Sequence, residues 1–144
     1  MPIILQAWVI NGLLIAVAVV IHYEILRTLS VLIPSWPIQH RMKVVVGLLG
    51  ALTAHVIEIW VFGIGFYLLV TNPEFGNLVG NYEHSLLDSV YFSFVMYTSL
   101  GIGDIVPVGI LRFLAGLETL TGLVLITWTA SFMYIEMQRF WERR

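Results

Sequence analysis

The chain has 144 residues, of which 59% are hydrophobic and 11% are charged, and its mean hydropathy of +0.91 is far above that of an ordinary soluble domain. Its formal net charge is −2 and its seven Lys and Arg are scattered, which excludes a basic face for nucleic acid. Because there is no cysteine, disulfides, thiolate catalysis and cysteine-ligated metal sites are excluded too. Composition predicts a single-domain, all-α protein of the lipid bilayer.

Residues 1–43 are expected to form a first transmembrane helix followed by a loop. A helix needs about 20 apolar residues to cross a hydrocarbon core of ~30 Å, and residues 3–21 meet this requirement. The helix can continue toward Ile33, after which Pro34 and Pro37 are expected to break it. The N-terminal stretch lacks the charged leader and the cleavage site of a secretory signal, so we expect a retained span.

Two further spans are predicted at residues 44–70 and 113–135, and a shorter apolar segment lies between them at residues 86–98. This segment, LLDSVYFSFVMYT, has 13 residues and as a helix would cover about 20 Å, too little to cross the membrane. Segments of this length are buried core helices or re-entrant helices. In a chain with so little other structure, we favour re-entry.

Basic residues predict the orientation. Most of them lie between the first and second spans or after the third, at Arg27, Arg41, Lys43, Arg139, Arg143 and Arg144. By the positive-inside rule these regions face the cytoplasm, so the N-terminus lies outside and residues 139–144 form a short basic cytoplasmic tail. The protein is thus expected in the cell membrane as a multi-pass protein whose short helix enters from the outer face. On that face, Glu74 and Glu83 form either a weakly acidic vestibule or a solvated loop.

The short helix is followed by TSLGIGD, residues 98–104. Irregular backbone at membrane depth is tolerated only when it is buried in protein or lines a water-filled cavity. Glycine reaches positive φ as readily as negative φ, so alternating it with other residues lets successive carbonyls turn to one side of an extended chain. The oxygens expected in this row belong to Thr98, Ser99, Leu100, Gly101, Ile102 and Gly103. One strand cannot surround an ion, but four copies about an axis can replace a cation's hydration shell, which predicts a homotetramer.

Neighbouring residues are expected to support this segment. The side chains of Leu100 and Ile102 should point outward and pack against the short helix. Asp104 should sit at the outer mouth and hydrogen-bond the backbone or the hydroxyl of Tyr91, and Pro107 should end the extended segment. The alternative is an ordinary turn between helices, for which glycine and aspartate are common.

The stretch from about 85 to 135 resembles the pore module of potassium channels, the two-helix-plus-pore-loop family with small prokaryotic members. The family filter TVGYGD corresponds to SLGIGD here, with serine for threonine and isoleucine for tyrosine. The resemblance implies a pore module at 44–138, made of an outer helix 44–70, a pore helix 86–98, a filter 99–104 and an inner helix 110–138. It also implies permeating K⁺ with no other metal or cofactor. The two departures leave the carbonyl row intact and put strict discrimination against Na⁺ in question.

In the inner helix, the resemblance places Gly122 where this helix often bends and turns Thr127 and Ser131 toward a cavity. Gly122 can equally be a site of close helix packing, a common use of glycine in membranes.

Three ionisable residues fall inside the predicted spans. His55 and Glu58 are three residues apart and share a helix face, and Glu118 lies in the third span. We favour structural hydrogen bonds, between His55 and Glu58 and from Glu118 to the second span or the short helix. A pH-sensitive gate is the alternative. The HxxE spacing suits a pair of ligands for one metal ion, but without a third ligand it predicts no metal site. His22 and Glu24 border the first span and are interpreted as interfacial residues.

We therefore predict a tetrameric cation channel that conducts potassium. The alternatives are a weakly selective channel for monovalent cations and a non-conducting membrane scaffold. The GxGD motif also occurs in intramembrane aspartyl proteases, whose chemistry needs two aspartates around one water. Asp88 is the only other aspartate and lies in the short helix, so we predict that the protein is not an enzyme.

Overall fold

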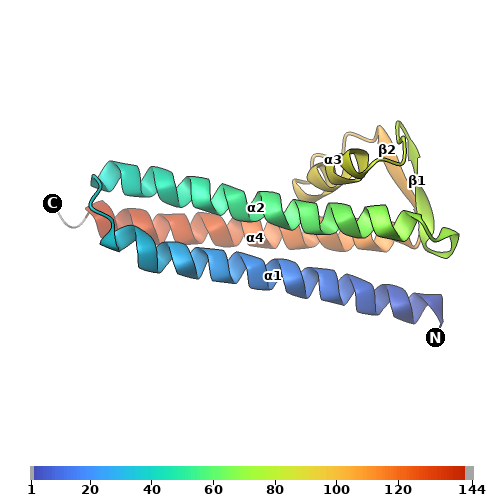
Figure 1. Ribbon diagram of the computed structural model, residues 1–144, viewed down its shortest axis with the longest axis horizontal. Coiled ribbons are helices and arrows are strands. Elements are labelled where there is room, and N and C mark those ends of the chain that lie inside the picture. Colours follow the sequence, from blue (N-terminus) through green and yellow to red (C-terminus); the bar gives the residue numbers. More distant parts are fainter. Residues whose placement is uncertain (1, 142–144) are drawn as a thin grey trace.

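A computed structural model describes residues 2–141, except for the side chains of residues 140 and 141, and shows three long helices side by side (Figure 1). They are α1 (Ile3–Ser35), α2 (His40–Val70) and α4 (Leu111–Trp141). Each is long and apolar enough to cross a membrane. The last residues of the expected basic tail, 142–144, lie outside the described residues.

The ends of these helices fall into two groups. The N-terminus lies at the same end of the molecule as the segment between α2 and α4, whereas the connection between α1 and α2 and the C-terminal end of α4 lie at the other (Figure 1). Helix α1 runs through Pro34 and ends at Ser35, and α2 begins at His40, earlier than the expected residue 44. Arg41, Lys43 and Arg139 lie toward the second end, and the expectation that this end faces the cytoplasm stays a prediction.

The short helix α3 (Leu86–Tyr97) lies alongside the part of α2 that is nearer the N-terminal end of the molecule (Figure 1). Its start is set by Ser85, whose hydroxyl oxygen accepts a hydrogen bond from the backbone N–H of Asp88 at 3.0 Å. The Asp88 carboxylate in turn accepts from the N–H of Glu83 at 2.9 Å and places a negative charge in the first turn, where the helix dipole favours it. The helix ends at Tyr97, one residue before the expected position.

A small sheet makes the fold mostly helical instead of all-α. After a 3₁₀ turn, η1 (Pro73–Phe75), strand β1 (Gly76–Gly80) pairs antiparallel with β2 (Ile105–Gly109). Pro107 does not end the extended segment as expected; it lies within β2, opposite Leu78. Proline lacks an N–H and is tolerated on edge strands, and a two-stranded sheet consists only of edges.

Glycines allow the two strands to approach. Gly76 has φ +111°, and a Cβ there would lie 2.0 Å from the carbonyl oxygen of Val108. Gly109, its partner in the register, has φ +72°. Any other residue would therefore strain or separate the strands. Because β1 and β2 flank residues 81–104, the sheet holds together the two ends of the segment that contains α3 and the glycine-rich loop.

Helix α3 packs between α2 and α4. Phe66 of α2 and Phe92 of α3 meet edge to face, with ring centroids 4.9 Å apart, and both are buried. Two helical glycines give α3 room. A Cβ at Gly63 of α2 would lie 2.8 Å from the Cα of Val90, and a Cβ at Gly122 of α4 would lie 2.2 Å from the carbonyl oxygen of Tyr97. Both helices therefore approach the backbone of α3 closely.

Candidate functional site

The loop at residues 98–104 changes backbone handedness at every second residue. Thr98 closes α3 with φ −82°, and positive φ follows at Ser99 (+58°), Gly101 (+56°) and Gly103 (+84°) but not at Leu100 or Ile102. Alternation at the glycines was expected from the sequence. The positive φ of Ser99, where the alternation begins, was not expected, because a non-glycine residue seldom adopts positive φ.

Hydrogen bonds fix the direction of the peptide units in this loop. The N–H of Ser99 donates to the carbonyl of Met96 at 3.0 Å, and those of Leu100 and Gly101 donate to the carbonyl of Val95 at 3.0 and 3.2 Å. Within residues 2–141, no hydrogen bond has a carbonyl oxygen of residues 98–103 as its acceptor. The N–H groups of Ser99, Leu100 and Gly101 thus point toward the end of α3. The carbonyl oxygens of residues 98–103 remain available to groups outside the chain.

The large side chains of the loop are exposed in the single chain. Leu100 is 65% exposed and Ile102 is 57% exposed, so neither packs against α3 of its own chain. A Cβ at Gly101 or Gly103 would meet nothing within 4 Å. The packing against the short helix that the sequence predicts for a fourfold assembly stays a prediction.

The outer end of the loop is anchored at Asp104. The hydroxyl of Tyr91 donates to its carboxylate at 2.9 Å, which is the expected contact, and this hydrogen bond raises the pKa of Tyr91. The backbone carbonyl of Asp104 accepts from the N–H of Asn81 at 2.9 Å and so extends the sheet by one contact. Asp104 therefore joins the loop to both α3 and the strand pair.

At the other end of the loop, Gly122 lies against Tyr97, the last residue of α3. Helix α4 continues through Gly122 without a break. This contact corresponds to the close-packing use of glycine, and the bending role stays a prediction.

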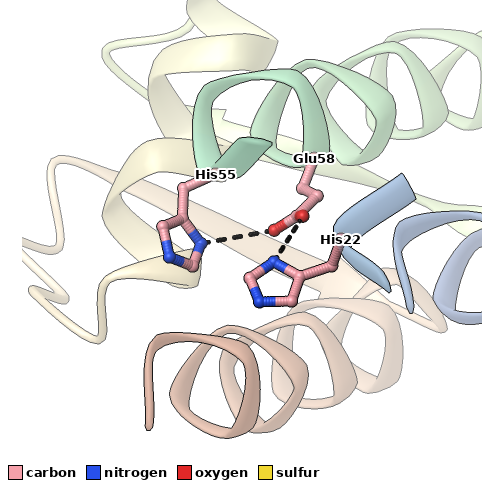
Figure 2. Close-up of side chains that lie close together, drawn as sticks. All are labelled: His22, His55 and Glu58. Carbon is pink, nitrogen blue, oxygen red and sulfur yellow. Dashed lines mark hydrogen bonds and ion pairs between the residues drawn. The ribbon is translucent and has the colours of Figure 1, made fainter. Parts of the chain in front are cut away.

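A buried polar cluster lies beside the same residue, Tyr97, and Figure 2 shows three of its side chains, His22, His55 and Glu58. His22 is not interfacial as expected: it is fully buried, and its Nδ1 lies 2.9 Å from Oε1 of Glu58. Nδ1 of His55 lies 3.3 Å from Oε2 of Glu58 and 2.9 Å from the hydroxyl of Tyr97, which itself donates to Glu58. Oγ1 of Thr129 completes the cluster, 2.9 Å from Nε2 of His55 and 3.3 Å from Nε2 of His22.

This cluster brings together α1, α2, α3 and α4. The sequence places His55 and Glu58 on one face because they are three residues apart, but it carries no signal for His22, which is 36 positions from Glu58. Glu24, the other residue expected at the border of the first span, is exposed and pairs with Arg27 at 3.4 Å.

Glu118 is fully buried and hydrogen-bonds to Ser93 of α3. The hydroxyl of Ser93 also lies 2.7 Å from the carbonyl oxygen of Ile59 in α2. The expected contact of Glu118 with the short helix is therefore present. Among the described residues, its second oxygen, Oε2, has no hydrogen-bond partner.

Comparison with known families decides the class of the protein. A family model described as ion channel matches residues 51–139, a segment that contains most of α2, all of α3, the loop and most of α4. The chain belongs to this ion channel family. The resemblance to potassium-channel pore modules seen in the sequence is thereby confirmed. No curated protein and no solved structure matches the chain.

The ion channel match leaves out residues 1–50 and with them the whole of α1. Helix α1 is nevertheless attached to the matched segment through His22, which contacts Glu58 of α2 and approaches Thr129 of α4. In this member of the ion channel family, a helix outside the family segment thus contributes a buried side chain to a cluster that touches the end of α3.

Proposed function

We propose that the chain is one subunit of a homotetrameric channel in the cell membrane that conducts K⁺. The observation that carries this proposal is the alternating backbone of residues 99–103. The N–H groups of Ser99, Leu100 and Gly101 bond to α3, and the carbonyl oxygens of residues 98–103 accept no hydrogen bond in the described chain. Four such loops about an axis would present rings of oxygens that replace the hydration shell of a cation. The permeating K⁺ is the ion that the channel would transport, and conduction itself would need no cofactor.

Tetramerisation would also cover apolar side chains that one chain leaves open. Leu100 and Ile102 are mostly exposed in the single chain, and full burial of such a side chain is worth about 1.5–3 kcal/mol. In a fourfold arrangement, a neighbouring subunit would supply the surface for them. The same arrangement would turn the C-terminal end of each α3, with its partial negative charge, toward the ion path.

A second candidate is a channel that discriminates weakly among monovalent cations. At Ile102 the chain carries an aliphatic side chain, which donates no hydrogen bond to a neighbouring helix. The hydroxyl of Ser99 makes no hydrogen bond within residues 2–141. The hydrogen bond between Tyr91 and Asp104 would then be the main side-chain restraint on the outer end of the loop. A loop with few restraints can adjust its diameter, which favours weak discrimination.

We propose no catalytic role for Asp104 of the GxGD motif or for Asp88. The carboxylate of Asp88 accepts from the backbone N–H of Glu83, whereas that of Asp104 accepts from Tyr91. Each carboxylate thus serves a separate local structure, the start of α3 and the end of the loop.

The test is a reversal-potential measurement on the purified full chain in lipid bilayers, with K⁺ on one side and Na⁺ on the other. The proposal expects a particle of four chains and a cation current whose reversal potential lies far from zero, on the side that marks K⁺ as much more permeant than Na⁺. A reversal potential near zero would favour the weakly selective channel. Absence of current from a correctly folded tetramer would contradict both candidates and favour a scaffold.

A further inference from the structure

We propose that His22, His55 and Glu58 form a binding site for a divalent transition metal, with zinc as the best match, between α1 and α2 (Figure 2). The HxxE pair of α2 lacks a third ligand in the sequence, and the fold supplies one from α1. This inference concerns metal binding by the folded chain and does not rest on ion conduction.

The ligand atoms lie at separations that suit a small metal ion. One atom from each of the three side chains lies within 4.8 Å of the others. The Nδ1 of His22 is 2.9 Å from one oxygen of Glu58, and the Nδ1 of His55 is 3.3 Å from the other. Ligands at about 2.0–2.2 Å from a tetrahedral Zn²⁺ are themselves roughly 3.3 Å apart. The 3.3 Å separation already matches this spacing, and the widest separation, at most 4.8 Å, would have to shorten by up to about 1.5 Å to accept the ion.

The opposite edges of both imidazole rings are also arranged as in a metal site. Histidine ligands usually donate their second ring N–H to an oxygen, which fixes the tautomer and orients the ring. Here Nε2 of His55 and Nε2 of His22 lie 2.9 and 3.3 Å from one oxygen, Oγ1 of Thr129. If both rings donate to Thr129, both Nδ1 lone pairs face the carboxylate, and a cation between them removes the repulsion.

The cluster also offers a fourth metal ligand, and the carboxylate of Glu58 favours a positive charge beside it. The hydroxyl of Tyr97 donates to Glu58 and lies 2.9 Å from Nδ1 of His55, so the phenol oxygen or a water can complete four ligands. Both ion pairs of Glu58 are with these histidines, which carry charge only when protonated. A carboxylate that stays charged away from water is stabilised by a cationic partner, and a metal supplies one without protonating a ring.

The ligand types point to the metal. Two imidazoles and one carboxylate favour Zn²⁺ over Mg²⁺ or Ca²⁺, which prefer oxygen ligands in larger numbers. A bound ion would fasten α1 to α2 at the level of Tyr97, which ends α3 and precedes the loop at 98–104. Occupancy of the site would therefore stabilise the position of α1 and the end of α3 together.

The experiment measures zinc binding to the purified full chain in detergent, by calorimetry and by metal content after removal of free ion. We expect one Zn²⁺ per chain, no competition by excess Mg²⁺, and a rise in the thermal unfolding midpoint. His22→Gln keeps an N–H donor for Glu58 but removes the imidazole nitrogen, and binding should weaken at least about 100-fold. Thr129→Val should weaken it about 10–100-fold, as removal of a partner of the ligands does.

The matched control is His84→Asn, which removes an exposed histidine outside the cluster and substitutes a residue that tolerates its φ of +58°. This variant should bind zinc as the unaltered chain does. Binding that is lost in His84→Asn, or that persists at full strength in His22→Gln and Thr129→Val, overturns the proposal. If His22→Gln does not fold, the proposal is still tested by Thr129→Val and by the unaltered chain. An unaltered chain that takes up no zinc also overturns the proposal.

Discussion

Gly122 of α4 faces the backbone carbonyl of Tyr97 so closely that a Cβ at position 122 would lie 2.2 Å from the carbonyl oxygen. Tyr97 is the last residue of α3, and the loop with the alternating backbone begins directly after it. The carbonyl belongs to the backbone and cannot move aside as a flexible side chain can. The absence of a side chain at position 122 therefore sets where α3 ends relative to α4.

Gly122→Ala is expected to push α4 away from α3 and to displace the start of the loop. Overpacking of this kind costs about 1–3 kcal/mol, so the thermal unfolding midpoint should fall and cation flux should decrease. The matched control is Gly116→Ala in the same helix, where a Cβ meets nothing within 4 Å and alanine favours the helix. If the two variants have the same unfolding midpoint and the same cation flux, the close contact between position 122 and Tyr97 influences neither quantity.

The helices are predictable because their signals are long and local. Length and hydropathy identify residues 3–21, 44–70 and 113–135 as spans, and the structure contains a membrane-capable helix over each. The short helix is recognisable because an apolar segment of 13 residues ends at glycine-rich sequence. In each case, neighbouring residues along the chain carry enough information to define the element.

The sheet and the third member of the polar cluster are not predictable in the same way. Strand β1 consists of GNLVG, whose glycines and asparagine are typical of turns, and it becomes a strand only by pairing with β2. His22 lies near the middle of α1, and nothing in its neighbourhood indicates that Glu58 of another helix will meet it. Contacts between distant segments depend on helix packing, which hydrophobic periodicity alone does not specify.

Gly101→Ala tests the alternating backbone. Gly101 has φ +56°, and a Cβ added there would meet nothing within 4 Å in the single chain, so an alanine would be opposed mainly by its backbone conformation. An L-residue in the left-handed region costs about 1–2 kcal/mol, and we expect a destabilised loop and strongly reduced cation flux. Introducing d-alanine at the same position is the control, because its mirror-image backbone favours positive φ. If both residues impair flux equally, the size of the side chain and not the backbone conformation is responsible.

The contact between Ser93 and Glu118 predicts a compensating pair of substitutions. Ser93→Ala should leave the buried carboxyl of Glu118 without its partner and destabilise the chain by about 1–3 kcal/mol. Adding Glu118→Met should restore most of the loss, because replacing both partners by apolar groups removes the unsatisfied group. Denaturation in detergent measures both effects. Strictly additive losses in the double variant would mean that the two side chains do not depend on one another.

The hydrogen bond from Tyr91 to Asp104 predicts a shift in titration at the outer end of the loop. Donation to the carboxylate raises the pKa of Tyr91 above the ordinary value of about 10, because the bond exists only while the phenol keeps its proton. The contribution of this bond to stability is therefore complete below about pH 10 and is lost as pH rises through the raised pKa. The difference in tyrosinate absorbance between the unaltered chain and Tyr91→Phe isolates this titration. Asp104→Asn, which keeps an oxygen acceptor without the charge, should return the midpoint toward the ordinary value, and a midpoint that this substitution leaves unchanged would contradict the assignment.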